Sequence, residues 1–349
     1  YSKPVKTFSI GFEDDYYNEL YNARLVAKRY KTDHHEFIVK PPDIESMEDI
    51  ICSFDEPFAD SSAIPTYFVS KCAREHVTVA LSGDGGDEIF CGYGNYRADK
   101  IGQYYRKLPE TLKSKIVPFM INRLPQSQDS LSTSQQLKKL MTMTRLSPEY
   151  GHIFWLNVFN GDLKEKLYKN EHLKELLKVN SADRCYNYFE RFYGDDFINR
   201  CINVDIKTVL PDDYLTKVDR MTMANSLEVR VPFLDHKLLE FAIAIPGRYK
   251  LKGLTTKHLL KKIMNKRLPE EIINGKKKGF SVPLSKWFRE GFSIVIDKYL
   301  SKEIIERRGF FHFNTVDSLS REHLSGKRDN SKLLWTLICF EIWHRRFLS

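Results

Sequence analysis

Residues 77–88 read VTVALSGDGGDE. A short run rich in β-branched residues, Val77–Leu81, gives way at once to a loop with three glycines and three carboxylates, which predicts a strand that ends in a charged loop. Glycines let a backbone approach an anion closely, whereas carboxylates beside a phosphate repel it unless a cation lies between them. The loop therefore indicates Mg²⁺-nucleotide chemistry. An acidic surface turn is the alternative that its composition allows.

Strands and helices alternate on the N-terminal side of this stretch. The patterns predict strands over residues 5–12 and 35–39, and helices over 16–30, up to Ser53, and over 64–74. Such alternation is typical of a parallel, doubly wound α/β sheet, in which ligands bind at the carboxyl ends of strands. Strand patterns nearly vanish beyond Lys100. We therefore interpret residues 1–100 as an α/β nucleotide-binding part and residues 101–349 as a mostly helical part that completes the same domain.

The composition is that of a globular protein, with 42% hydrophobic and 29% charged residues. Six cysteines show no CxxC pair, so neither a disulfide framework nor a zinc site is predicted, and a reducing cytoplasm fits best. The most apolar run, residues 333–340, is far shorter than the roughly 20 residues that span a bilayer. A net charge of +9 suits a polyanionic substrate such as ATP. Nucleic-acid binding is disfavoured, because the lysines are dispersed and no nucleic-acid motif accompanies them.

The chain contains neither GxxxxGK[ST] nor GxGxxG after a strand, which disfavours a Walker-type NTPase and a Rossmann dinucleotide site. Instead, several stretches resemble, in the same order, the synthetase domain of glutamine-dependent asparagine synthetases. They are FSIGF (8–12), FDEPFAD (54–60), SGDGGDE (82–88), LPDDYLTKVDRMTMANSLEVRVPFLD (210–235), TKH (256–258) and KKKGFS (276–281). The resemblance covers nearly the whole chain and implies the fold of the PP-loop ATP pyrophosphatases, also called adenine nucleotide alpha hydrolase-like.

The resemblance also implies roles for individual residues. ATP would be bound by Ile10 against the adenine and by Ser82, Gly83 and Gly85 in the loop. Asp87 would bind Mg²⁺, and Asp84 would lie near the forming acyl-adenylate. Asp84 stands where close relatives often carry glutamate, so its side chain is one methylene shorter.

Two lysines are the candidate cations for charged transition states. The resemblance places Lys277 at the α-phosphate and the developing oxyanion, and Lys257 at a helix start suited to phosphate, although Lys257 could instead be an exposed helix residue. Glu228 and Tyr93 could form the carboxylate–hydroxyl pair with which β-lactam-forming members deprotonate an amine. The alternative that we favour is a structural ion pair between Glu228 and Arg230.

The implied reaction is ATP-dependent amide synthesis: aspartate is adenylated, pyrophosphate leaves, and ammonia from a glutaminase domain outside this chain attacks the acyl-adenylate. Neither the pyrophosphate-holding SGGxDS loop nor an N-terminal cysteine occurs here, so we expect a fragment of a longer protein that is inactive alone. A homodimer is one assembly that the complete protein could form. The sequence of residues 55–62 differs from that of some bacterial members that use aspartate. The acid that is activated could therefore instead belong to a sugar, a peptide or a β-lactam-type precursor. A noncatalytic nucleotide- or nucleic-acid-binding fragment is the third reading.

Overall fold

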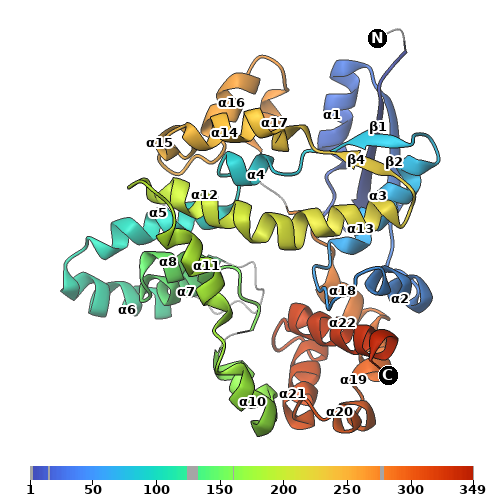
Figure 1. Cartoon of the computed structure of the whole chain (residues 1–349), viewed down its shortest axis with the longest axis vertical. Coiled ribbons are helices and arrows are strands. Elements are labelled where there is room, and N and C mark those ends of the chain that lie inside the picture. Colours follow the sequence, from blue (N-terminus) through green and yellow to red (C-terminus); the bar gives the residue numbers. More distant parts are fainter. Residues whose placement is uncertain (1–2, 15, 124–132, 160, 276–278, 349) are drawn as a thin grey trace.

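The computed structural model describes residues 3–14, 16–123, 133–159, 161–275 and 279–348. These residues form a mostly helical α/β structure (Figure 1). The strands are β1 (Lys6–Phe12), β2 (Asp33–Val39), β3 (Val79–Leu81) and β4 (Glu228–Arg230). The helices of the first part are α1 (Leu20–Tyr30), α2 (Ile44–Cys52), α3 (Ala63–Arg74), α4 (Gly86–Ile89) and α5 (Gly94–Arg106).

In the rest of the described chain, β4 is the only strand, and the other regular elements are helices. Its middle contains η1 (Leu112–Ile116), α6 (Val117–Asn122), α7 (Thr133–Thr144), α8 (Pro148–Phe154), α9 (Gly161–Leu167), α10 (Asn170–Leu176), α11 (Ser181–Glu190), α12 (Phe197–Lys207), η2 (Leu210–Leu215) and α13 (Thr216–Met223). After β4 come η3 (Pro232–Leu234), α14 (His236–Ala244), α15 (Gly247–Lys250), α16 (His258–Met264), α17 (Glu270–Asn274), α18 (Leu284–Arg289), α19 (Ser293–Leu300), α20 (Lys302–Arg308), α21 (Phe313–Leu324) and α22 (Ser331–Phe347).

The described strands form two separate parallel pairs. β1 pairs with β2 from Lys6↔Asp33 to Phe12↔Val39 across the crossover helix α1, which confirms the predicted βαβ unit. β3 pairs with β4 in a ladder of three residues. The parallel direction was predicted correctly, but these strands do not make up one continuous sheet. β4 was not predicted, because Glu-Val-Arg contains only one apolar residue and shows no strand pattern.

Helix α1 begins at Leu20, four residues later than the pattern at residues 16–30 predicted. The side chain of Asn18 causes this delay. Its amide group donates to the carbonyl oxygen of Phe12 (3.1 Å), and its oxygen accepts from the backbone N–H of Leu20 (3.0 Å). This local hydrogen bonding offers the backbone an alternative to the helix until Leu20.

The largest core cluster joins the N-terminal strands to the C-terminal helices. It contains Ile10 from β1, Met47 from α2, Ile64 from α3, Phe288 from α18 and Trp335 from α22. The apolar run at residues 333–340 lies within α22, and no helix in the described ranges is both long and apolar enough to cross a membrane. The division at residue 100 stays a prediction, although residues from both sides of it share this core.

A second cluster packs α5, α8, α11 and α12 around Tyr96, Ile153, Phe189 and Ile202. In Figure 1, α12, which belongs to this cluster, and α13 follow one another across the middle of the molecule, toward the region of the strands. α13 also packs on α3. The α12–α13 segment therefore connects the helical cluster with the region that holds the two sheets.

Candidate active site

The loop after β3 is the SGDGGDE motif, and it is held against the motif at residues 210–235. The backbone N–H of Ser82 donates to the carbonyl oxygen of Arg230 (3.0 Å), which extends the β3–β4 ladder by one residue. The hydroxyl of Ser82 then donates to a carboxylate oxygen of Asp84 (2.6 Å). The SGDGGDE motif and the motif that ends at Asp235 therefore meet at the carboxyl end of a parallel strand pair, where α/β folds place their ligands.

Two glycines of the loop differ in why a side chain is absent. Gly85 has a φ of +81°, and a Cβ there would lie 2.3 Å from Cδ2 of Leu234, so both its conformation and its packing require glycine. A Cβ at Gly83 would meet no atom within 4 Å. Gly83 is therefore not required by packing within the described chain, and its exposed backbone is open to a ligand.

Asp87 and Lys257 form an ion pair of 2.9 Å between Oδ1 and Nζ, with side-chain exposures of 17% and 27%. Gly92 leaves room for this pair: a Cβ there would lie 1.7 Å from Oδ1 of Asp87 and 2.4 Å from Cε of Lys257. The structure thus brings together the predicted metal ligand and one of the two predicted cations, which are 170 positions apart in the sequence.

The backbone also fixes the position of Lys257. This residue precedes α16 with a φ of +50°, in the left-handed region that few residues other than glycine adopt, and its N–H donates to the carbonyl oxygen of Cys91 (3.3 Å). The alternative of a freely exposed helix lysine is wrong, because the side chain is mostly buried and ion-paired. A backbone held in an uncommon conformation suggests that the lysine is positioned for a purpose.

The suggested pair of Glu228 and Tyr93 does not form. Glu228 lies on β4 and is paired with Arg230 (2.8 Å), both side chains being largely exposed. Tyr93 instead donates from its hydroxyl to Glu88 (2.7 Å). Sequence reasoning missed Glu88 because the short helix α4 turns this last carboxylate of the motif inward, where it is only 1% exposed. Burial raises the pKa of Glu88, and it also raises that of Tyr93, so the pair is held in a weakly hydrated place.

A small cavity of about 240 Å³ lies beside the Glu88–Tyr93 pair. Its lining includes both of these residues together with Asp205 of α12 and Tyr214 of η2. The ring of Tyr214 lies 5.9 Å from that of Tyr93, centroid to centroid. The cavity therefore brings two carboxylates, Glu88 and Asp205, and two tyrosines to one space, which apolar side chains such as Trp155 also line.

A second ionic group, the Lys217 cluster, consists of Lys217, Asp60, Ser62 and Asp213, and the sequence predicted no role for it. Nζ of Lys217 lies 2.7 Å from Asp60 and 2.6 Å from the hydroxyl of Ser62, and Lys217 is 6% exposed. Burial raises the pKa of the neighbouring Asp213 to about 7, with a further contribution from the charge of Asp60. The only sequence signal was that Asp60 belongs to FDEPFAD, and that Asp213 and Lys217 belong to LPDDYLTKVDR, whereas Ser62 lies two residues after the first stretch.

Two predicted residues lie apart from this group. Ile10 is a buried residue of β1, 9% exposed, opposite Phe37 of β2. It belongs to the other strand pair and packs in the large core cluster, so its contact with adenine stays a prediction. Lys277 lies outside the described residues.

The donors of the loop fit a hard divalent cation. Asp84 and Asp87 offer carboxylate oxygens, which are the ligands that Mg²⁺ prefers, usually one or two at a time with phosphate oxygens and water. Both carboxylates are partly exposed, so such an ion could keep part of its hydration shell. The residues present therefore fit a magnesium–nucleotide complex.

Comparisons with known proteins point to a single family. A family model described as asparagine synthase matches residues 1–345. Asparagine synthetase (glutamine-hydrolyzing) 1 of Bacillus subtilis is 35% identical over 341 residues, which cover 97% of this chain and 52% of that protein. A putative asparagine synthetase of Mycobacterium tuberculosis is 29% identical over 349 residues (98% and 51%), and an amidase of Penicillium rubens is 23% identical over 336 residues (89% and 48%). The chain spans about half the length of the curated relatives it matches.

Proposed function

Because the chain belongs to the asparagine synthase family, we propose that it carries the synthetase half of an ATP-dependent amide-forming ligase that acts on aspartate. The observation that carries this proposal is the Asp87–Lys257 pair beside the open loop Ser82–Gly85, at the carboxyl end of β3. A carboxylate for a metal ion and a fixed ammonium group side by side suit a substrate that contains both phosphate and a divalent cation.

Family membership implies an adenine nucleotide alpha hydrolase fold. We propose that both parallel pairs belong to one doubly wound sheet of the PP-loop type, completed by a further strand. The exposed apolar side chains of β3 support this, since Leu81 is 72% exposed and Val79 is 42% exposed. Apolar residues on a strand normally pack against a neighbouring layer or strand.

In the proposed adenylation, a carboxylate oxygen of aspartate attacks the α-phosphorus of ATP, the bond to the β-phosphate oxygen breaks, and pyrophosphate leaves. The backbone at Ser82, Gly83 and Gly85 lies against the nucleotide, while Ile10 contacts the adenine. Mg²⁺, when bound, neutralises phosphate charge. Asp87 would hold it, and Lys257 supplies a second, fixed positive charge.

In the proposed second step, ammonia attacks the carbonyl carbon of the acyl-adenylate, AMP leaves, and the nitrogen loses a proton. Asp84 would lie near the acyl-adenylate, and Lys277 would stabilise the oxyanion. Tyr93 takes part through Glu88, its actual partner, rather than through Glu228. Burial raises the pKa of Glu88, which makes its carboxylate a stronger proton acceptor than an exposed glutamate.

A second candidate is amide formation on another carboxylate, such as that of a sugar, a peptide or a β-lactam-type precursor. It is favoured by the similarity to a fungal amidase and by the segment at residues 55–62, which includes Asp60 and Ser62 of the Lys217 cluster. The chemistry of activation would be the same. Only the acid would differ.

The experiment that tests the proposal is ATP–pyrophosphate exchange by the full-length protein across a panel of carboxylic acids. We expect exchange that requires Mg²⁺ and is strongest with aspartate. Exchange that is strongest with another acid would select the second candidate. No exchange with any acid, in a protein that binds ATP, would favour a noncatalytic nucleotide-binding role.

A further inference from the structure

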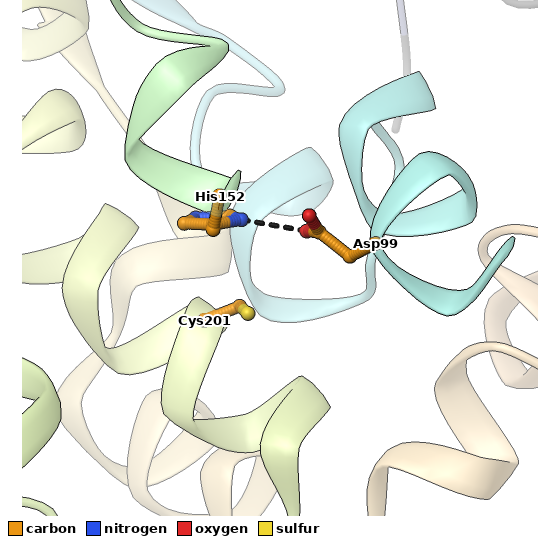
Figure 2. Close-up of side chains that lie close together, drawn as sticks. All are labelled: Asp99, His152 and Cys201. Carbon is orange, nitrogen blue, oxygen red and sulfur yellow. Dashed lines mark hydrogen bonds and ion pairs between the residues drawn. The ribbon is translucent and has the colours of Figure 1, made fainter. Parts of the chain in front are cut away.

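A buried cluster behind the cavity combines three kinds of metal-binding side chain. Asp99 comes from α5, His152 from α8 and Cys201 from α12, and their possible ligand atoms all lie within 4.8 Å of one another. Asp99 is 2% exposed, and the other two are fully buried. Figure 2 shows the imidazole facing the Asp99 carboxylate and the sulfur of Cys201 lying beside the space between them. The three helices thus point a carboxylate, an imidazole and a thiol at a common space.

The neighbours of His152 orient its ring as they would a metal-binding histidine. Asp205 lies 3.0 Å from Nε2 and also accepts a hydrogen bond from the hydroxyl of Tyr96 (2.5 Å). A carboxylate that accepts from one ring nitrogen fixes the tautomer and directs the lone pair of the other nitrogen at a metal ion. The other nitrogen, Nδ1, lies 2.7 Å from a carboxylate oxygen of Asp99, so its lone pair would face an ion that Asp99 binds.

One carboxylate oxygen of this cluster lacks a hydrogen bond within the described residues. Oδ1 of Asp99 is buried and has no hydrogen-bond partner within the described part of the chain. Leaving a buried carboxylate oxygen unsatisfied is costly. A cation bound by Asp99 would remove that cost.

We propose that Asp99, His152 and Cys201 bind one zinc ion. Thiolate, imidazole and carboxylate together suit Zn²⁺ better than Mg²⁺ or Ca²⁺, and Asp99 can supply both of its oxygens, so that four donor atoms surround the ion. Binding leaves the net charge of the cluster unchanged. Zn²⁺ brings two positive charges, and two protons leave: one from the thiol of Cys201 and one from the imidazolium of His152, which bridges two carboxylates. The residues are sealed from solvent, so the ion ties α5, α8 and α12 together and does not bind substrate.

The test begins with the metal content of the chain, expressed in zinc-supplemented medium and measured by atomic emission. We expect one zinc ion per chain in the wild type and loss of zinc in Cys201→Ser. The matched control is Cys339→Ser, which changes another buried cysteine, in α22, and should keep the zinc. Cobalt in place of zinc should give a thiolate-to-metal charge-transfer band that is absent from Cys201→Ser.

A second variant covers the case in which Cys201→Ser does not fold. Asp205→Asn leaves all three ligands in place but weakens the support of His152, and it should lower zinc affinity by about 10–100-fold, with folding checked by circular dichroism. The proposal is overturned if the folded wild type contains no zinc and shows no cobalt–thiolate band. It is equally overturned if Cys201→Ser binds as much zinc as the wild type.

Discussion

Asp87 is the residue on which the chemistry of the site depends most. Its carboxylate is paired with Lys257 and is the proposed ligand of Mg²⁺. Asp87→Asn keeps the shape of the side chain and removes the charge, so it should lower the rate of adenylation by at least about a hundredfold. The free energy of unfolding should change by less than about 1 kcal/mol, because a partly exposed ion pair contributes little. Initial rates and urea unfolding measure the two effects.

A matched control for this variant is Asp317→Asn, which also removes a carboxylate from an ion pair, with Arg321 on α21. It should leave the rate unchanged. If Asp87→Asn kept both its rate and its magnesium requirement, Asp87 would be no more than a turn residue.

Gly92 gives an independent test of the same pair. Alanine there places its Cβ within 1.7 Å of Asp87 Oδ1, so the two charged side chains must move. We expect the rate to fall by up to about a hundredfold and the stability to fall by about 1–3 kcal/mol. Gly94→Ala is the control, because its Cβ would meet nothing within 4 Å. In an Asp87→Asn background, Gly92→Ala should add little further loss of rate. Two fully additive losses would contradict the account.

Residue roles could be predicted where a motif is local, and less well where partners come from distant segments. The loop Ser82–Glu88 was identified from its glycines and carboxylates alone. That Lys257 would lie against Asp87 could not be predicted, because the contact depends on the unusual backbone at Lys257. The favoured ion pair between Glu228 and Arg230 was confirmed, but Glu88 as the partner of Tyr93 was missed, since the direction of Glu88 is set by a helix of only four residues.

At the scale of elements, η2 and α13 are attached to the segment before α3 by the Lys217 cluster. Burial and Asp60 raise the pKa of Asp213 to about 7 from an ordinary value of 3.8. The folded chain therefore binds a proton that the unfolded chain has already released between about pH 4 and pH 7, and stability should fall as pH rises through this window. Asp60 titrates below the window: burial raises its pKa, but Lys217 lowers it further, to below 3.8.

Asp213→Asn keeps this position uncharged at every pH. We expect the variant to be more stable than the wild type at pH 8, by at least about 1 kcal/mol, and the difference to shrink as pH falls toward 4. Urea unfolding at a series of pH values measures it. Asp212→Asn is the control, because its carboxylate is exposed and pairs with Arg184, and it should show no such trend. A wild type as stable as Asp213→Asn at pH 8 would show that Asp213 carries its charge without penalty.

Elements with a clear period could be predicted from the sequence, and short ones could not. The βαβ unit of β1, α1 and β2 followed from alternation and helical spacing. β4 has three residues and exists because it pairs with β3, a contact across almost 150 positions that local patterns do not encode. The delayed start of α1 likewise depends on one side chain, Asn18.

At the scale of the whole molecule, the core continues from β1 to α22, so the 349 residues should fold together. The sequence nevertheless contains no SGGxDS loop. We expect this chain alone to be folded by circular dichroism but inactive in ATP–pyrophosphate exchange, because loss of the pyrophosphate donors removes roughly 3 kcal/mol or more of transition-state stabilisation. Robust aspartate-dependent exchange by this chain would mean that another loop, such as Ser82–Gly85, holds the pyrophosphate.

The proposed reaction joins a carboxylate to the α-phosphate of ATP. It is tested most directly with aspartate whose side-chain carboxylate is labelled with ¹⁸O, in a reaction of the full-length protein with ATP, Mg²⁺ and ammonia. Adenylation transfers one labelled oxygen from the acid to the departing nucleotide. We predict that mass spectrometry will find ¹⁸O in AMP, with unlabelled pyrophosphate as the other product. Label in inorganic phosphate together with formation of ADP would show an acyl-phosphate route and would contradict the account.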